Sequence, residues 1–352
     1  MKDKQELKRI YKIGGVLINN SSDIEKCLNF IFKESGNPFI IFSAIGKTTS
    51  ELSSLINLAE QNIDFNIPVN KIIASHLKLV DNQSSISKIL DVKSKIENYL
   101  DAIRTMGECT SIAKDKVLTF GEKLAEIIYY EKISSYSQNV LALDAEKYIK
   151  TDSEYNNAKL NINNTIIKLE KYSNFLQPIL MAGFIGSDKM GNSTTMGFES
   201  SNLTSVVVAL ALNIKSVTWL TNVEGVYRCN PNLFEKTKKA KEINYTQALE
   251  LSKYGLKLIP KSVIEIAQNN SIDIFIGRPD DSDFSIIKKT DENNYFLMQN
   301  GNDVIIIGNP KLILNEILEI INYEELIISK NSIILKSDDK STLLKVFNLI
   351  NI

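Results

Sequence analysis

Residues 183–204, with the sequence GFIGSDKMGNSTTMGFESSNLT, constrain the fold of this chain more than any other stretch. They begin at a glycine turn, form a hairpin around residues 189–192 and lead into a helix whose residues 205–212 are small and apolar. A buried strand over residues 216–222 and a glycine turn over residues 223–231 come next. This alternation of helices and apolar strands predicts an α/β sandwich with a mainly parallel sheet.

The predicted helix start within this stretch also suits an anion. Glycine, serine and threonine precede it, and a helix N-terminus presents unpaired N–H groups together with the positive end of the helix dipole. A nucleotide would fit between this helix start and the neighbouring glycine turn. An ordinary strand–helix–strand crossover has the same pattern, so this stretch alone leaves both interpretations open.

Composition argues against several classes of protein. The 352 residues can form one large or two smaller domains. The 41 Lys and Arg residues nearly balance the 42 Asp and Glu residues, so we expect no binding to nucleic acid or to a membrane. No segment resembles a signal peptide or a membrane span, and the 3 cysteines have no paired spacing. We therefore expect a soluble, cytoplasmic protein.

The chain has a single histidine, His76. A single histidine nearly excludes a His-rich metal centre, and its expected place on a helix surface nearly excludes a His-based triad, so we predict no metal ligands in the protein itself. The surrounding residues have a helical period, so we expect His76 on the surface of a helix.

A lysine and two glycines lie at the end of the first predicted strand. The strand covers residues 9–12, and Gly14 and Gly15 follow directly after Lys12. The glycines allow a phosphate to approach the backbone closely, and the lysine can neutralise its charge. On its own this pattern is weak, because most such sequences are simple turns.

A helix and a strand come next, and a second loop follows them. A capping box of Ser22 and Glu25 is predicted to begin the helix, and the apolar residues 38–44 form the strand. Residues 43–49, SAIGKTT, contain the GKT of a P-loop, but a P-loop requires glycine where Ile41 stands. We therefore reject the P-loop interpretation.

Several blocks of the sequence resemble aspartate kinases. Three match the nucleotide half of that family: GFIGSDKMGNSTTMG at 183–197, TNVEGVY at 221–227 and YGLKLIPKSVIEIA at 254–267. The other half is matched by KIGG at 12–15, SAIGKTT at 43–49, FGEKL at 120–124 and LDAEKYIKTD at 143–152. The resemblance extends over about residues 9–278.

The resemblance implies a fold and an activity. Residues 1–280 would form an amino acid kinase domain, a carbamate kinase-like αβα sandwich. Its N-lobe would bind the amino acid, and its C-lobe, from about residue 183, would bind ATP with Mg²⁺. The implied reaction transfers the γ-phosphate of ATP to the β-carboxylate of L-aspartate. The product, 4-phospho-L-aspartate, opens the biosynthesis of lysine, threonine and methionine.

The resemblance also implies roles for individual residues. The catalytic positions are Lys12, Lys257 and Asn202. The positions that contact the amino acid are Ser43, Thr49, Glu122, Phe198 and Ser201. The positions that contact the nucleotide are Gly14, Gly15, Thr221, Asn222, Tyr227 and Asn232. Without the matching neighbours, Glu122 would be interpreted as an ordinary solvated glutamate on a helix.

This chain departs from the family pattern at the same positions. Phe198 stands where the family has an arginine for the α-carboxylate of the substrate, and Asn202 replaces the aspartate that orients the two lysines. Asn222 replaces another aspartate, and Asn232 stands where an arginine is common. Three hypotheses therefore remain open: an active aspartate kinase, a non-catalytic paralogue that binds nucleotide or a partner, and a kinase with a changed acceptor.

The C-terminal part has a different pattern. Residues 278–294 are polar and rich in aspartate, which predicts a linker. Residues 295–352 then predict a strand, a helix, a hairpin and a final helix, an order that resembles a single or partial ACT-like α+β domain. We expect this domain to join two copies into a homodimer. We also expect feedback control by lysine or threonine to be absent or altered.

Overall fold

The computed structural model describes residues 9–197, 200–256, 259–281, 283–321, 323–337 and 341–350. The chain divides into two compact units, Met1–Asn222 and Val223–Ile352, which we treat one after the other. Among the described residues, no helix is long and apolar enough to cross a membrane.

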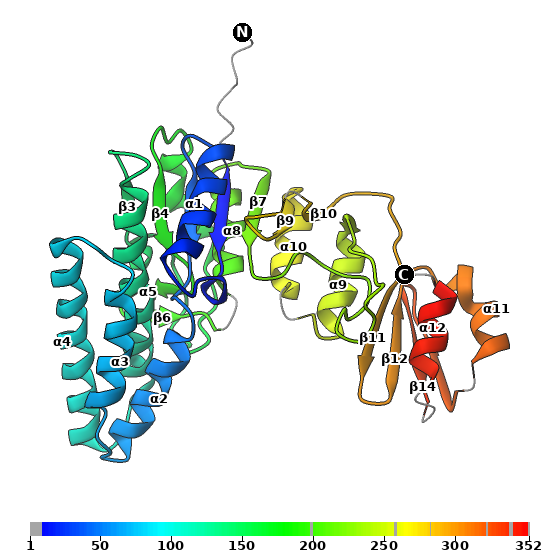
Figure 1. Cartoon of the computed structure of the whole chain (residues 1–352), viewed down its shortest axis with the longest axis horizontal. Helices are drawn as coiled ribbons and strands as arrows, with labels where there is room; N and C mark the ends of the chain where they lie inside the picture. Colours follow the sequence, from blue (N-terminus) through cyan, green and yellow to red (C-terminus); the bar gives the residue numbers. More distant parts are fainter. Residues whose placement is uncertain are drawn as a thin grey trace, which may run out of the picture. The chain divides into compact units, whose positions relative to one another are not determined.

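A parallel sheet organises the first unit. Its strands lie in the order β3-β4-β2-β1-β7, and every pairing between neighbours is parallel (Figure 1). All residues of β2 and β4 are buried, as expected for central strands covered by helices on both faces. The bounds are β1 Ile10–Ile13, β2 Phe39–Phe42, β3 Leu141–Leu143, β4 Ile179–Ala182 and β7 Ser216–Leu220.

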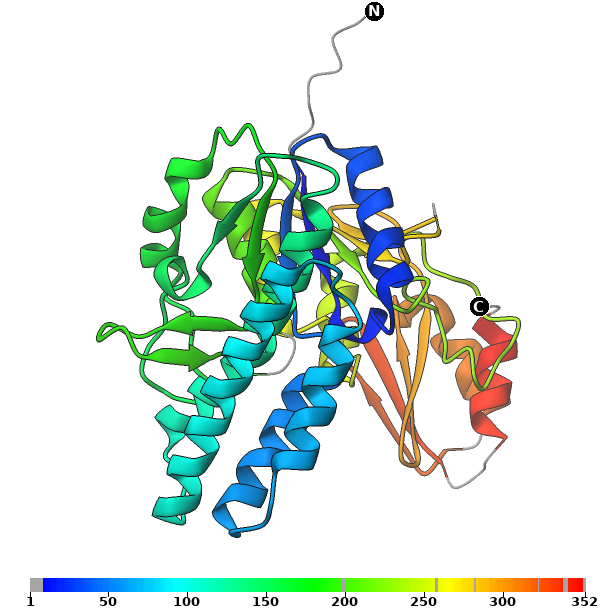
Figure 2. The same ribbon diagram turned by 60° about the vertical axis from the view of Figure 1, so that its left-hand side comes forward.

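Helices make up most of the rest of this unit. Figure 2 shows α2 to α5 running beside one another. The bounds are α1 Ser21–Glu34, α2 Thr48–Glu60, α3 Asn66–Leu77, α4 Gln83–Met106, α5 Ser111–Ile133, α6 Ala145–Tyr148, α7 Ile162–Leu169 and α8 Ser200–Ala211. Two short 3₁₀ helices cover Gly15–Leu17 and Glu170–Tyr172.

Two local predictions in this unit are wrong. The cap of α1 is Asn20, whose side chain accepts a hydrogen bond from the Asp23 amide, so Ser22 and Glu25 do not form the predicted capping box. His76 is only 2% exposed, because α3 packs against α2, α4 and α5 and turns this side chain inward. A helical period identifies the helix, but it does not identify the face that other helices cover.

The predicted hairpin around residues 189–192 is confirmed. Strands β5 (Ile185–Ser187) and β6 (Ser193–Thr195) pair antiparallel and form a small separate sheet.

The second unit begins with three strands and two helices. Strand β10 (Ser285–Lys288) pairs antiparallel with β9 (Asp273–Gly277) and parallel with β8 (Glu242–Asn244). Helices α9 (Tyr245–Lys253) and α10 (Lys261–Asn270) accompany them. The predicted linker over residues 278–294 is therefore wrong at β10, whose alternating burial is too short to stand out among its charged neighbours.

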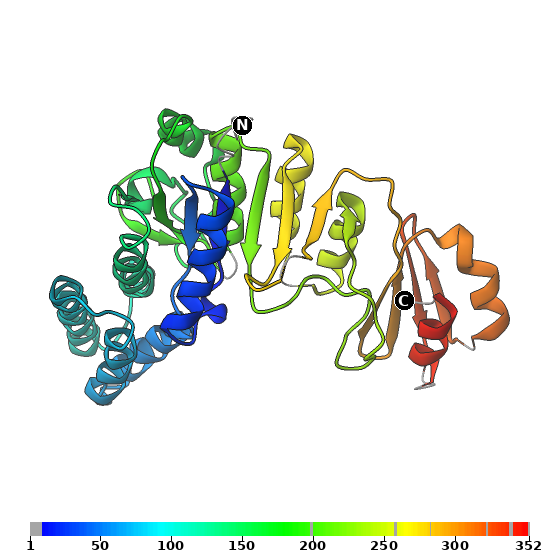
Figure 3. The ribbon, with the colours of Figure 1, turned by 45° about the horizontal axis from the view of Figure 1, so that its top comes forward.

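The C-terminal part is an antiparallel sheet with two helices. The strand order is β11-β12-β14-β13, and α11 and α12 cover one face (Figures 1 and 3). The bounds are β11 Phe296–Asn300, β12 Asp303–Ile307, α11 Pro310–Ile320, β13 Glu325–Ile328, β14 Ser332–Lys336 and α12 Thr342–Ile350. From β12 onward this is the strand–helix–hairpin–helix order that the sequence predicts for an ACT-like domain.

Candidate active site

The carboxyl ends of four parallel strands define the candidate site. Strand β1 pairs with β2 and β7, and β2 pairs with β4, so that Ile13, Phe42, Ala182 and Leu220 lie in register at the last position of each strand. The next residues, Gly14, Ser43, Gly183 and Thr221, therefore emerge at one edge of the sheet. In open α/β sheets, ligands bind outside this edge.

The turn after β1 brings Lys12 and the two glycines together. The Gly14 amide donates to Leu220 O at 2.9 Å, which fixes the turn against β7. The Lys12 ammonium lies beside this turn, 3.5 Å from the position that a Cβ at Gly14 would occupy. A Cβ at Gly15 would lie 1.9 Å from Ala44 O, so only glycine fits there. The turn combines close-packed backbone with one partly exposed cation.

The loop after β2, residues 43–49, contacts two other parts of the site. The Ser43 hydroxyl lies 3.0 Å from the Ser201 hydroxyl, in the first turn of α8. The Gly46 amide donates to Gly15 O at 3.0 Å. We call residues 43–49 the acceptor loop, because the family resemblance predicts that Ser43 and Thr49 contact the phosphate acceptor.

Glu122 lies inside the protein and faces the acceptor loop. It is 1% exposed, and its Oε1 accepts a hydrogen bond from the Ala44 amide at 3.1 Å. Its Oε2 is buried and has no hydrogen-bond partner among the described residues. Burial raises the pKa of this carboxyl group to about 8. These observations contradict the alternative of a solvated glutamate and leave one oxygen available for a donor.

The remaining predicted residues lie in different places. Ser201 and Asn202 are buried in the first turn of α8, and Ser201 packs so closely on Gly183 that a Cβ there would lie 2.5 Å from it. Thr49 is half-buried in the first turn of α2, and the exposed Asn222 follows the buried Thr221 after β7.

Two predicted nucleotide contacts belong to the second unit. The Tyr227 hydroxyl donates to Glu224 Oε2 at 2.5 Å, and Asn232 is exposed. Phe198 and Lys257 lie outside the described residues. Their assignments remain predictions.

Sequence reasoning missed Asp115, which joins α5 to the hairpin. This carboxylate is 0% exposed and accepts hydrogen bonds from the amides of Asn156 and Thr195 and from the Thr195 hydroxyl, at 3.0, 3.0 and 2.5 Å. Burial raises the pKa of Asp115. No local motif indicates this role, because its partners are 41 and 80 residues away.

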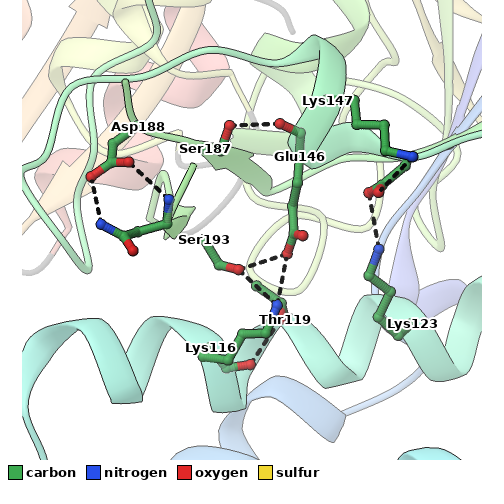
Figure 4. A network of polar contacts seen from close by, with 10 residues as sticks. Lys116, Thr119, Lys123, Glu146, Lys147, Ser187, Asp188 and Ser193 are labelled. Carbon is green, nitrogen blue, oxygen red and sulfur yellow. Dashed lines mark hydrogen bonds and ion pairs between the residues drawn. The ribbon is translucent and has the colours of Figure 1, made fainter. Parts of the chain in front are cut away.

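A second polar network joins the same elements. Lys116 of α5 donates to Ser193 Oγ at 2.9 Å and to Glu146 Oε1 at 3.3 Å, and Ser193 donates to Glu146 at 2.7 Å (Figure 4). Ser187 of β5 donates to the backbone oxygen of Glu146 at 2.6 Å. Together with Asp115, these contacts hold the hairpin against the helix that carries Glu122.

Comparison with known proteins identifies the class to which this architecture belongs. The sequence model of the amino acid kinase family matches residues 8–278. The chain therefore belongs to the amino acid kinase family.

Individual relatives carry the name aspartokinase. The chain is 24% identical over 286 residues to aspartokinase 1, chloroplastic, of Arabidopsis thaliana, with 77% of this chain and 50% of that protein covered. It is 23% identical over 288 residues to lysine-sensitive aspartokinase 3 of Escherichia coli strain K12, with 77% and 62% covered. The chain thus spans between half and two thirds of the length of these relatives.

Solved structures share the fold. E. coli aspartokinase III in complex with aspartate and ADP matches with a TM-score of 0.76 at 19% identity, covering 98% of this chain and 84% of that one. Clostridium acetobutylicum aspartate kinase matches with a TM-score of 0.68 at 20% identity, covering 98% and 83%. At these identities the likeness establishes the amino acid kinase fold with its C-terminal α+β part.

Proposed function

We propose that this chain is an aspartate kinase, which transfers the γ-phosphate of ATP to the β-carboxylate of L-aspartate. The observation that carries the proposal is the strand-end site of the first unit. There Lys12 lies beside a glycine turn, and buried Glu122 lies behind the loop that carries Ser43. The relatives named aspartokinase and the related structure with aspartate and ADP support the same reaction.

Lys12 and the glycine turn would bind the phosphates. Phosphoryl transfer requires mainly positioning and neutralisation of the charge on the transferred group. Backbone at Gly14 and Gly15 can approach a phosphate closely, and the Lys12 ammonium can neutralise it. We assign Lys257 to the same task from the sequence resemblance. The nucleotide's remaining contacts are assigned to Thr221, Asn222, Tyr227 and Asn232.

Magnesium would bind through the nucleotide. Among the described residues, no group of three or more His, Cys, Asp or Glu side chains could hold a metal ion. Mg²⁺ commonly keeps water ligands and binds substrate phosphates, so the site fits an ion that arrives with ATP and neutralises its β- and γ-phosphates.

Glu122 and the acceptor loop would bind the amino acid. The free Oε2 of Glu122 would accept from the substrate ammonium, and the hydroxyls of Ser43, Thr49 and Ser201 would orient the substrate. The attacking β-carboxylate is already ionised near neutral pH, so the reaction requires no general base. Asn202, in the first turn of α8, is neutral and would orient the lysines by hydrogen bonding alone.

A kinase with a changed acceptor is the second candidate. The described side chains assigned to the acceptor are the neutral Ser43, Thr49 and Ser201 and the acidic Glu122, and none of these four is a cation. Arginine binds an α-carboxylate most strongly. The loss of the family's arginine therefore favours an acceptor that has no α-carboxylate.

Trapping with hydroxylamine separates these candidates. An acyl phosphate reacts with hydroxylamine to give a hydroxamate and phosphate, so the hydroxamate, detected as its coloured iron(III) complex, reports transfer to a carboxylate. L-aspartate should give hydroxamate, and N-acetyl-L-aspartate, which lacks the ammonium, should give far less. Equal turnover of β-alanine, which lacks the α-carboxylate, would favour the changed acceptor. Nucleotide binding without any hydroxamate would favour the non-catalytic paralogue.

A further inference from the structure

The single histidine is buried against the acceptor loop. His76 lies in α3 with Nδ1 2.8 Å from Ile72 O and Nε2 3.3 Å from the hydroxyl oxygen of Thr48. A carbonyl oxygen only accepts, so the ring proton is on Nδ1 and donates to Ile72 O. Burial lowers the pKa of His76, which favours the neutral ring with Nε2 as an acceptor. The Thr48 hydroxyl has one proton, which it shares between Ile45 O at 2.6 Å and Nε2 at 3.3 Å in a three-centre bond.

Thr48 is where the acceptor loop becomes α2. Its side chain is 2% exposed, and its hydroxyl also lies 2.6 Å from Ile45 O within the loop. The residue before it, Lys47, is the N-cap of α2 and makes no side-chain capping bond. Because the helix start lacks this usual support, the contacts of Thr48 carry more of the task of fixing the loop.

The loop is therefore held from three directions. The Ala44 amide is bound by Glu122 of α5, the Gly46 amide by Gly15 O, and Thr48 by His76 of α3. Thr48 also packs close to Gly121, since its Cγ2 lies 3.5 Å from the position of a Cβ there. Of these three contacts, the one with His76 comes from outside the candidate site.

We propose that His76 is a positioning residue for the amino acid acceptor. Through Thr48 it fixes the acceptor loop, so that Ser43 and Thr49 face the substrate while the Ala44 amide orients Glu122. This inference rests on the proposed function, since it assigns the loop to the acceptor. His76 itself does not contact the substrate.

Matched variants distinguish the contact with Thr48 from the other hydrogen bond of His76. The His76→Gln amide reaches the place of Nε2 and retains the contact with Thr48. The His76→Asn amide lies at the place of Nδ1, retains the bond to Ile72 O and loses Thr48. Thr48→Ser retains the hydroxyl, whereas Thr48→Val replaces it with a methyl group of similar size.

Steady-state kinetics provides the first test. Loss of one neutral hydrogen bond corresponds to a change of roughly three- to tenfold, so His76→Asn and Thr48→Val should raise the acceptor KM by about that factor. The KM for ATP should change less than about twofold. His76→Gln and Thr48→Ser should stay near the wild type. The double variant His76→Asn/Thr48→Val should have an acceptor KM no higher than that of Thr48→Val alone, since Thr48→Val already removes the contact with His76 together with the bond to Ile45 O.

Hydrogen–deuterium exchange provides a test that is independent of activity. The amides of residues 44–49 should exchange several times faster in His76→Asn and Thr48→Val than in the wild type, but not in His76→Gln or Thr48→Ser. If the wild type phosphorylates no amino acid, the proposed function fails while this experiment still decides whether His76 fixes the loop. Wild-type exchange in His76→Asn, or additive KM effects in the double variant, would overturn the inference.

Discussion

Glu122 combines complete burial with an unused carboxylate oxygen. With a pKa of about 8 it is protonated at neutral pH in the free protein. A substrate ammonium beside Oε2 would favour the ionised form instead, because an opposite charge stabilises it. Binding of the amino acid would therefore release a proton from Glu122.

This coupling predicts a pH-dependent affinity for the acceptor. As the pH rises from 6 to 8.5, a growing fraction of the free protein has the carboxylate that the ammonium requires, so the acceptor KM should fall. Glu122→Gln cannot ionise and should remove this dependence. It should also raise the acceptor KM by about ten- to a hundredfold at pH 8.5, since a charge-assisted bond is lost.

Glu126→Gln, on the partly exposed side of the same helix, is the control and should keep the pH profile. A wild-type acceptor KM that stays constant between pH 6 and 8.5 would contradict the assigned role of Glu122.

For individual residues, sequence motifs located the side chains but did not reveal the groups that they contact. The block FGEKL located Glu122, but its burial and its contact with Ala44 depend on the loop after β2, 78 residues earlier in the chain. Asp115 and His76 have no such block, and their partners come from distant segments. A side chain whose role is set by tertiary packing gives no local signal.

Among the elements, the turn after β1 and the acceptor loop pack backbone against backbone. Gly15→Ala would place a methyl group against Ala44 O, so both segments must move apart. We expect a loss of unfolding free energy of at least about 2 kcal/mol, as for overpacked cores. Gly14→Ala is the matched control, because its nearest neighbour atom, Leu220 O, is 3.3 Å away. Urea unfolding that shows equal stability for the two variants would contradict this packing.

Asp115 is expected to stabilise the joint between α5 and the hairpin. In Asp115→Asn, an amide NH₂ replaces one acceptor oxygen and faces backbone donors of Asn156 or Thr195. This should reduce the free energy of unfolding by about 1–3 kcal/mol. Asp91→Asn, an exposed change on α4, should stay within about 0.5 kcal/mol of the wild type. A small effect of Asp115→Asn in urea unfolding would show that the joint does not depend on this carboxylate.

The main elements follow from local pattern, and the exceptions have physical reasons. An apolar run identified β2 because buried parallel strands are apolar on both faces. Strand β10 was missed because it is short and lies in a charged segment. The predicted N-cap of α1, Ser22, was wrong because Asn20, two residues earlier, caps the helix. Short elements that tertiary pairing stabilises are the hardest to find from sequence.

At the scale of the whole molecule, residues outside the predicted C-terminal domain contribute to the core of its sheet. Its core includes Cys229, and Phe347 of α12 stacks on Phe234 with ring centroids 4.1 Å apart. Residues well before the predicted start of this domain thus contribute to its packing. The sequence pattern predicted its strands and helices, whereas these contacts required the structure.

The outer strand of this sheet suits the homodimer that we predict from the sequence. In β13, Ile327 and Ile328 are 42% and 49% exposed, and among the described strands β13 pairs only with β14. We predict that Ile327→Lys/Ile328→Lys converts a dimer into a monomer in light scattering, because two buried charges would oppose association. Leu176→Lys, an exposed apolar position in the first unit, should remain dimeric. A monomeric wild type would contradict the proposed dimer.

The identity of the phosphorylated carboxylate tests the central claim most directly. The wild-type chain would be incubated with ATP, Mg²⁺ and L-aspartate, treated with borohydride and analysed by mass spectrometry, with Lys12→Met as the control. Borohydride reduces an acyl phosphate to an alcohol, so phosphorylation of the β-carboxylate predicts homoserine from the wild type and almost none from Lys12→Met. No amino alcohol from the wild type, or the isomer reduced at the α-carboxylate, would contradict the assignment as an aspartate kinase.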